Sequence, residues 1–186
     1  MNFKRHPEYE GQHAFLGASS YHWLNYSEEK LANTYSNLLA KQKGTELHEF
    51  AATCIRLGQK LPRSQKTLNL YVNDAIGYRM SPEVVLFYSD NCFGTADAIA
   101  FNNNILRIHD YKSGVTPAKM EQLMIYAALF CLEYKVKPSE LADIELRIYQ
   151  FDDYTVCHPT AEEVASIINI IIKSDKIVDE VRSKEG

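Results

Sequence analysis

The chain has 186 residues, of which 46% are hydrophobic and 24% are charged, and its formal net charge is −4. This composition is typical of one globular domain with a sizeable core, and the length leaves no room for a second full domain. The acidic balance argues against a protein that coats nucleic acid nonspecifically, although an enzyme with a local basic groove remains compatible with it.

The sequence also argues against a membrane protein and against a secreted protein. No segment reaches the roughly 20 consecutive apolar residues of a membrane span. The N-terminal run Met1-Asn2-Phe3-Lys4-Arg5-His6 is followed by polar residues and not by the apolar core of a signal peptide. We therefore expect a cytoplasmic protein with no membrane partner.

The four cysteines lie far apart in the sequence and form no C-x-x-C pair. This spacing fits neither a zinc ribbon nor an iron–sulfur framework. Buried free thiols are the preferred interpretation, because free cysteine is among the most buried residue types. The residues are Cys54, Cys92, Cys131 and Cys157.

Residues 1–43 are expected to be mainly helical after a loose segment that reaches about Gly17. Apolar residues at helical spacing predict a helix through Trp23, a break at residues 25–29, and then a second helix or a continuation of the first.

A separate helix is predicted from about Thr45 to Leu57, with Gly44 before it and Gly58 at its end. His48 lies beside the apolar face of this helix. Most lone histidines in such a position are held by a hydrogen bond and bind nothing, although histidine is the commonest metal ligand.

Between Leu61 and Tyr88 we expect a linker, a helix and a first strand. Apolar residues recur at helical spacing up to Arg79, and Pro82 then ends this pattern. Residues 83–88 are β-branched and aromatic, which favours a strand.

A β-hairpin is predicted next, because residues 95–101 and residues 105–111 both have strand character. Three asparagines at 102–104 separate them, and asparagine tolerates the positive φ angles of a tight turn. If the turn is centred on Asn103 and Asn104, Asn102 faces Ile105.

This register brings two carboxylates and a lysine together. Asp97 would lie opposite Asp110, and Lys112 would share a face with Asp110, whereas a shift of one residue would separate them. Carboxylates this close repel one another unless a cation lies between them, and Mg²⁺ prefers oxygen ligands. The pattern indicates a metal site, although the tripeptide alone is also compatible with a surface ion pair.

A loop after Lys112 leads to a helix predicted over residues 118–134. Gln122 and Tyr126 stand one turn apart on it, and Lys119 lies three residues before Gln122 on the same side. This stripe is expected to reach over the open end of the hairpin. A half-buried tyrosine beside a solvated glutamine is the alternative.

A strand from Ile144 to Phe151, a turn at Asp152-Asp153 and a closing helix from Pro159 or Thr160 complete the chain. The order of elements predicts an α+β fold with N-terminal helices, a central sheet, a crossing helix, another strand and a closing helix.

Four segments, in this order, resemble the motif set of the PD-(D/E)XK nuclease superfamily. More narrowly, they resemble its RecB-type branch, which includes phage and CRISPR-associated exonucleases with a histidine, G-x-x-D, D-x-K and Q-x-x-x-Y. The segments are Gly44-Thr45-Glu46-Leu47-His48, Gly94-Thr95-Ala96-Asp97, Asp110-Tyr111-Lys112 and Gln122-Leu123-Met124-Ile125-Tyr126.

The resemblance implies a restriction-endonuclease-like core, in which helices flank a central mixed β-sheet. It divides one nuclease domain, residues 1–186, into an N-terminal helical part (1–43), a catalytic core (44–151) and a closing helix (152–186).

The resemblance also implies a site for Mg²⁺ or Mn²⁺. His48, Asp97 and Asp110 would bind the ion together with the main-chain carbonyl of Tyr111. A bound metal polarises the phosphate and lowers the pKa of bound water.

The remaining motif residues take catalytic and DNA-binding roles by the same resemblance. Lys112 would position and help deprotonate the attacking water. Gln122 and Tyr126 would orient Lys112 and contact the DNA backbone, and Lys119 is a further candidate for contact with DNA.

Two departures from the family pattern are informative. Ala96-Asp97 replaces the Pro-Asp of the superfamily name, as is usual in this branch. The cysteine spacing that holds an iron–sulfur cluster in the CRISPR-associated relatives is missing, so no cluster is expected.

The expected function is therefore a metal-dependent deoxyribonuclease. An exonuclease that acts on DNA ends in phage-type replication, recombination or repair is favoured, because nothing resembles an appended domain that reads bases. Single-stranded ends are a reasonable substrate, with Tyr111, Tyr126 and Trp23 available for stacking. A structure-specific endonuclease and a catalytically silent subunit that binds DNA or a partner remain open.

The resemblance does not select one protein partner. A recombination or replication protein would accompany the DNA, and a homo-oligomer is compatible with the sequence. The expected location is the host cytoplasm if the protein is encoded by a phage.

Overall fold

The computed structural model describes residues 4–185 and divides into two compact units, Met1–Lys43 and Gly44–Gly186. The division falls where the catalytic core was expected to begin. That the whole chain acts as one domain stays a prediction, and Met1 to Phe3 and Gly186 lie outside the described residues.

The first unit contains little regular structure before its long helix. Two 3₁₀ helices, Pro7–Tyr9 and Ala18–Asn25, take the place of the helix expected through Trp23. The indole nitrogen of Trp23 donates a hydrogen bond to the carbonyl of Gly17 at 3.0 Å, which holds the second of these turns closed.

Helix α1 runs without interruption from Glu28 to Leu57, so the separate helix predicted from Thr45 is wrong. A glycine inside a helix costs only about 1 kcal/mol relative to alanine, and Gly44 lies among strong helix formers. Gly58, by contrast, has φ of 64° and follows the last helical residue, as predicted.

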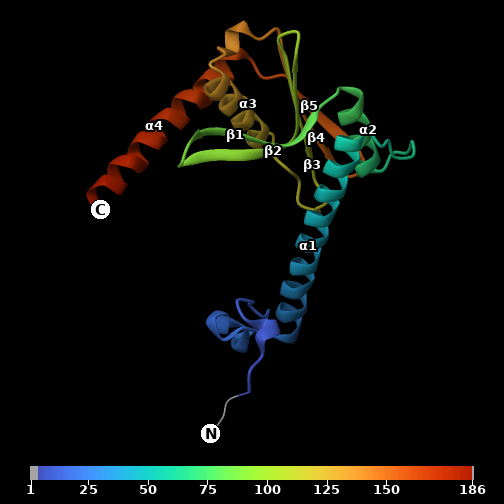
Figure 1. Ribbon diagram of the computed structural model, residues 1–186, viewed down its shortest axis with the longest axis vertical. Coiled ribbons are helices and arrows are strands. Elements are labelled where there is room, and N and C mark those ends of the chain that lie inside the picture. Colours follow the sequence, from blue (N-terminus) through green and yellow to red (C-terminus); the bar gives the residue numbers. More distant parts are fainter. Residues whose placement is uncertain (1–3, 186) are drawn as a thin grey trace. The chain divides into compact units, whose positions relative to one another are not determined.

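One five-stranded sheet forms the centre of the second unit, in the order β1-β2-β3-β4-β5 (Figure 1). All neighbouring strands are antiparallel except β3 and β4, which run parallel. The predicted α+β class, with a mixed sheet flanked by helices, is therefore confirmed. The strands are β1 (Ser81–Ser89), β2 (Cys92–Asn102), β3 (Ile105–Tyr111), β4 (Asp143–Gln150) and β5 (Asp153–Cys157).

The β2–β3 hairpin has the predicted register. Asn102 pairs with Ile105, and the same register continues to the pair of Ala98 and His109. Asn103 and Asn104 have φ angles of 52° and 58°, as a type I′ turn requires at both central positions.

Strand β5 was not anticipated from the sequence. It is a short edge strand whose residues are exposed except for the half-buried Cys157, so it has no buried face to produce an alternating pattern. The turn before it is centred on Phe151 and Asp152, one residue earlier than predicted.

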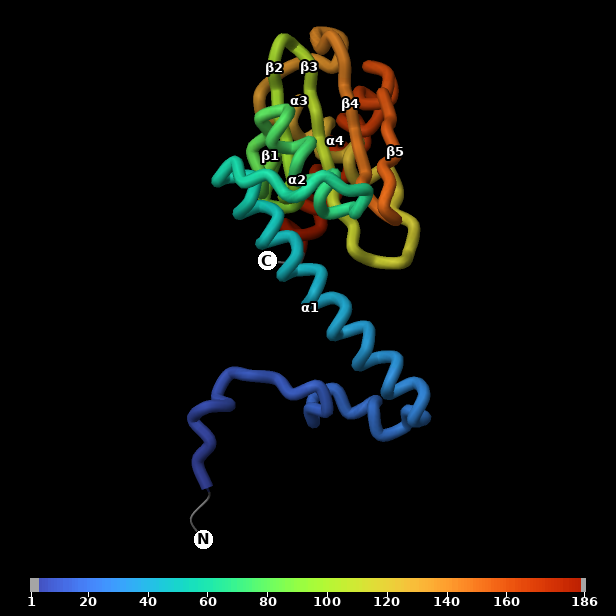
Figure 2. Tube along the Cα trace, turned by 90° about the vertical axis from the view of Figure 1, so that its right-hand side faces the viewer, coloured from blue at the N-terminus to red at the C-terminus, as the bar shows by residue number. Residues whose placement is uncertain are grey.

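Helices cover both faces of the sheet, as Figure 2 shows. Helices α3 (Glu121–Tyr134) and α4 (Ala161–Glu185) pack on one face over Leu106 and Leu146. Helix α2 (Thr67–Gly77) and the second half of α1 pack on the other, around Val72 and Tyr149. The middle of the sheet, β3 and β4, is thus buried on both sides. Polar residues there need partners within the protein.

The expected buried thiols are partly confirmed. Cys54 and Cys131 are buried, whereas Cys92 and Cys157 are only half-buried, and all four are free. No helix within the described part of the chain is both long enough and apolar enough to cross a membrane.

A polar network lies between α2 and the sheet. Buried Glu145 faces Arg107, His109 and Arg147, with its Oε1 2.9 Å from Nε of Arg147. Arg147 also reaches Asp74 of α2 at 3.3 Å. Burial, together with the positive charge of the two arginines, lowers the pKa of His109 to about 3, so this histidine is neutral.

We expect Glu145→Ala to lower the free energy of unfolding by about 3–5 kcal/mol, because it leaves two partly buried guanidinium groups without their carboxylate. Urea denaturation would measure this loss. Glu180→Ala, a change at an exposed position of α4, should alter stability by less than about 0.5 kcal/mol. Equal effects of the two substitutions would contradict a structural role for the network.

Candidate functional site

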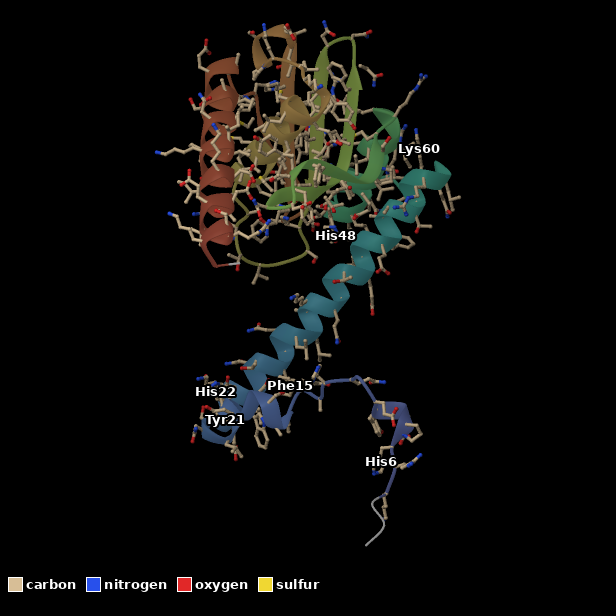
Figure 3. All side chains as sticks on the ribbon, turned by 60° about the vertical axis from the view of Figure 1, so that its left-hand side comes forward. His6, Phe15, Tyr21, His22, His48 and Lys60 are labelled. Carbon is tan, nitrogen blue, oxygen red and sulfur yellow. The ribbon has the colours of Figure 1, made fainter. Side chains whose placement is uncertain are left out.

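A group of three side chains that could hold a metal meets on the sheet. His48 lies on α1, where Figure 3 labels it. Its Nδ1 lies 3.3 Å from Oδ2 of Asp97, on β2. Glu83 of β1 completes the group, in which the ligand atoms all lie within 4.8 Å of one another. The hydrogen bond to Asp97 raises the pKa of His48 above its usual value.

Glu83 was missed by the sequence analysis. Its φ of 54° places it in the left-handed region, which is uncommon for a residue other than glycine and often marks a functional constraint. Burial, and then the charge of Asp97, raise the pKa of its carboxyl. The one available signal was an acidic residue on a predicted strand, and no motif singled it out.

Asp110 lies deeper, with only 1% of its surface exposed. Its Oδ1 accepts a hydrogen bond from Nζ of Lys112 at 3.0 Å. Its Oδ2 lies 2.9 Å from the same nitrogen but has no hydrogen-bond partner in residues 4–185. Burial first, and then the charge of Asp97, raise the pKa of Asp110 to about 6.

Lys112 begins a chain of hydrogen bonds that leads into α3. Its Nζ donates to Oε1 of Gln122 at 3.1 Å, and Nε2 of Gln122 donates to the hydroxyl of Tyr126 at 3.1 Å. The predicted reach of this helix over the hairpin is therefore present. Gly94 makes room for it, since a Cβ at that position would lie 2.9 Å from Cε1 of Tyr126.

Tyr111 links the two aspartates through its backbone. Its amide donates to Oδ2 of Asp97 at 2.9 Å. Its ring is buried, stacked against Tyr71 and in a T-shaped contact with His48. The expectation that this ring stacks on a base is therefore wrong, whereas the role of its carbonyl as a metal ligand stays a prediction.

Lys119 is less well placed than expected. It precedes the first residue of α3, Glu121, so it does not lie on a helical stripe with Gln122. The side chain of Lys119 is exposed, and its contact with DNA stays a prediction.

The residues present fit a hard divalent ion. His48, Glu83 and Asp97 supply one nitrogen and two carboxylates, a donor set suited to Mg²⁺ or Mn²⁺. Asp110 stands outside this group of three, but the charge of Asp97 reaches it, and its Oδ2 lacks a hydrogen-bond donor in the described chain. A cation shared by these acids would offset their mutual repulsion.

Gly94→Ala should lower the free energy of unfolding by about 1–3 kcal/mol, because Tyr126 would have to move away from the added methyl group. Gly77→Ala is the matched control, since its Cβ would meet nothing within 4 Å and it ends a helix, and we expect it to be neutral or slightly stabilising. Thermal and urea denaturation of both variants would decide this.

Asp110 should make the metal-free chain less stable as the pH rises. The pKa of Asp110 is raised in the folded chain, so between about pH 4 and about pH 6 the folded chain holds a proton that the unfolded chain has released. Binding of this proton stabilises the folded chain, and the stabilisation is lost as the pH rises through this range. Asp110→Asn should remove that part of the pH dependence and be more stable than the wild type above about pH 7. Urea titrations without divalent ions would test it, with the exposed Asp90→Asn as the control.

Comparison with known proteins adds one finding. None of the curated proteins and none of the solved structures compared with the chain matches it. Residues 84–177 match the model of a family described as a protein of unknown function (DUF2800). This segment includes Asp97, Asp110 and Lys112 but neither His48 nor Glu83. Because the match spans half of the chain, the protein belongs to the DUF2800 family.

Proposed function

We propose that the chain is a Mg²⁺- or Mn²⁺-dependent deoxyribonuclease of the RecB-type branch of the PD-(D/E)XK superfamily. The observation that carries the proposal is buried Asp110, which lies near the charge of Asp97 and pairs with Lys112 through both of its oxygens. A fold has no structural need for two neighbouring acids in this setting, because burial and repulsion both disfavour their charges.

The ligands of the proposed metal come from separate elements. His48, Glu83, Asp97 and Asp110 would hold it, and the bound ion would supply a water of lowered pKa and an electrophile for the phosphate. The three carboxylates and the histidine must all be deprotonated to bind metal. Since the pKa values of His48 and Asp110 are raised, metal binding should weaken as the pH falls.

In this proposal Lys112 acts on the attacking water. Its ammonium is held between the carboxylate of Asp110 and the amide oxygen of Gln122, so its direction is fixed before substrate binds. In this role it would orient the water and stabilise the negative charge that develops on the phosphate. Tyr126 restrains Gln122, and both would also contact the DNA backbone.

We infer that the enzyme digests DNA from ends, in phage-type replication, recombination or repair. Within residues 44–185 the strands and long helices all belong to the sheet and its covering layers, and no separate module for reading bases is present there. Phosphate contacts alone carry no sequence information. A recombination or replication protein would be its partner, in the cytoplasm.

The test is the release of nucleotides from end-labelled linear single strands and duplexes with Mg²⁺, Mn²⁺ or EDTA, with closed-circular DNA in parallel. We expect metal-dependent loss of the linear substrates alone. Lys112→Ala and Asp110→Ala should each reduce the rate by about a hundredfold or more. The exposed Lys173→Ala, on α4, should leave it unchanged.

Other outcomes separate the alternatives. Nicking of closed circles would favour a structure-specific endonuclease. If folded protein that binds the metal cleaves none of the substrates, the proposed nuclease activity is wrong, and a DNA-binding or partner-binding subunit takes its place.

A further inference from the structure

The β1–β2 hairpin carries an exposed aromatic face. Phe87 pairs with Phe93 across the two strands, and Val85 pairs with Thr95. The two phenyl rings are stacked, with centroids 6.4 Å apart and planes at 27°. Phe87 is 45% exposed and Phe93 is 62% exposed. We call these four residues the aromatic face.

The aromatic face is continuous with the proposed metal site. Asp97 follows Thr95 by two residues on β2, and side chains two apart share a face of a strand. Glu83 of β1 lies beside Asp97 in the proposed metal site. Exposure along β1 alternates accordingly, and the opposite face packs buried Leu86 into the core. Phe93 lies about 13 Å along the strand from Asp97, a distance that about four stacked nucleotides would span.

The hairpin is held in place at its tip, so this face is preformed. The side chains of Ser89 and Asn91 both donate hydrogen bonds to Asp175 of α4, and Asn91 also donates to Asp179. Arg182 donates to the amide oxygen of Asn91. In Figure 1 the hairpin accordingly extends beside α3 to α4.

The edge of β1 is poorly suited to pairing with a strand of another chain. The amide of Phe87 donates to the carboxylate of Glu133 of α3 at 2.8 Å. Pro82 has no amide hydrogen to donate, and the positive φ of Glu83 interrupts the extended backbone. Features of this kind block edge-to-edge association, so the rings are available face-on while the strand edge is protected.

We propose that Phe87 and Phe93 form a stacking platform for the unpaired bases of a DNA strand whose backbone passes the metal site. This inference rests on the proposed nuclease function and assigns its substrate as a single-stranded end or tail. Bases in a duplex already stack on their neighbours, whereas unpaired bases stack on aromatic rings without sequence preference. The platform also replaces Tyr111, whose buried ring cannot serve.

The first test measures binding apart from cleavage. In a Lys112→Ala background with Mg²⁺, the affinity for a fluorescent oligothymidine strand is measured by anisotropy. The pair of changes Phe87→Ala and Phe93→Ala should weaken binding by about 5-fold to about 100-fold. Phe87→Tyr with Phe93→Tyr should restore it, and Phe151→Ala, which removes an equally exposed ring from the β4–β5 turn, should leave it unchanged.

A base-free strand shows whether the rings contact bases. An abasic strand of the same length keeps its phosphates but has no bases to stack. The variant with alanine at Phe87 and Phe93 should therefore bind the abasic and the normal strand with equal affinity. The parent protein should bind the abasic strand more weakly than the normal strand. The salt dependence of binding should not change, because no phosphate contact is removed. Equal losses on the abasic and normal strands would overturn the platform.

Different results would contradict the stacking platform and the proposed nuclease activity. Cleavage by the wild type with unchanged affinity of the alanine variant would overturn the platform alone. Loss of affinity without cleavage by the wild type would overturn the nuclease and keep the platform. Unchanged affinity with a lower sedimentation coefficient would instead assign the aromatic face to contact between two copies of the chain.

Discussion

The site depends on a carboxylate that the fold buries beside another negative charge. Asp110 lies on β3, a strand with neighbours on both sides and helices over both faces of the sheet. Asp110 is almost fully buried there, and its pKa stays raised although Lys112 pairs with it. The surrounding core must therefore outweigh an unfavourable electrostatic term, and a cation that binds both acids would relieve that term and stabilise the folded state.

Hairpin geometry sets which side chains meet. The two asparagines at the β2–β3 turn accept positive φ angles, and this fixes the register that brings Asp97 to the amide of Tyr111. Helix α3 then connects the parallel strands and delivers Gln122 to Lys112. Its close approach is possible because Gly94 has no Cβ. Turn, glycine and helix thus cooperate to bring Lys112 to Gln122, which lies ten residues later on another element.

The sequence predicted correctly the elements that are determined by local φ preferences and hydrophobic periodicity. The Asn103-Asn104 turn, the strands beside it and the amphipathic face of α3 follow from φ preferences and from periodicity. It failed where tertiary packing decides. Gly44 does not break α1, and the exposed strand β5 has no buried face to reveal it. Glu83 reaches the site because of its own unusual backbone conformation, which neither composition nor spacing encodes.

The two halves of the site differ in how they are built. Lys112, Gln122 and Tyr126 lie within the family segment and are joined by direct hydrogen bonds. His48 and Glu83 lie before that segment and approach Asp97 from α1 and β1. A histidine that donates Nδ1–H to a carboxylate is oriented to bind metal through its other nitrogen. In the proposed enzyme, Asp97 would therefore both bind the metal and orient His48, and it also accepts a hydrogen bond from the amide of Tyr111.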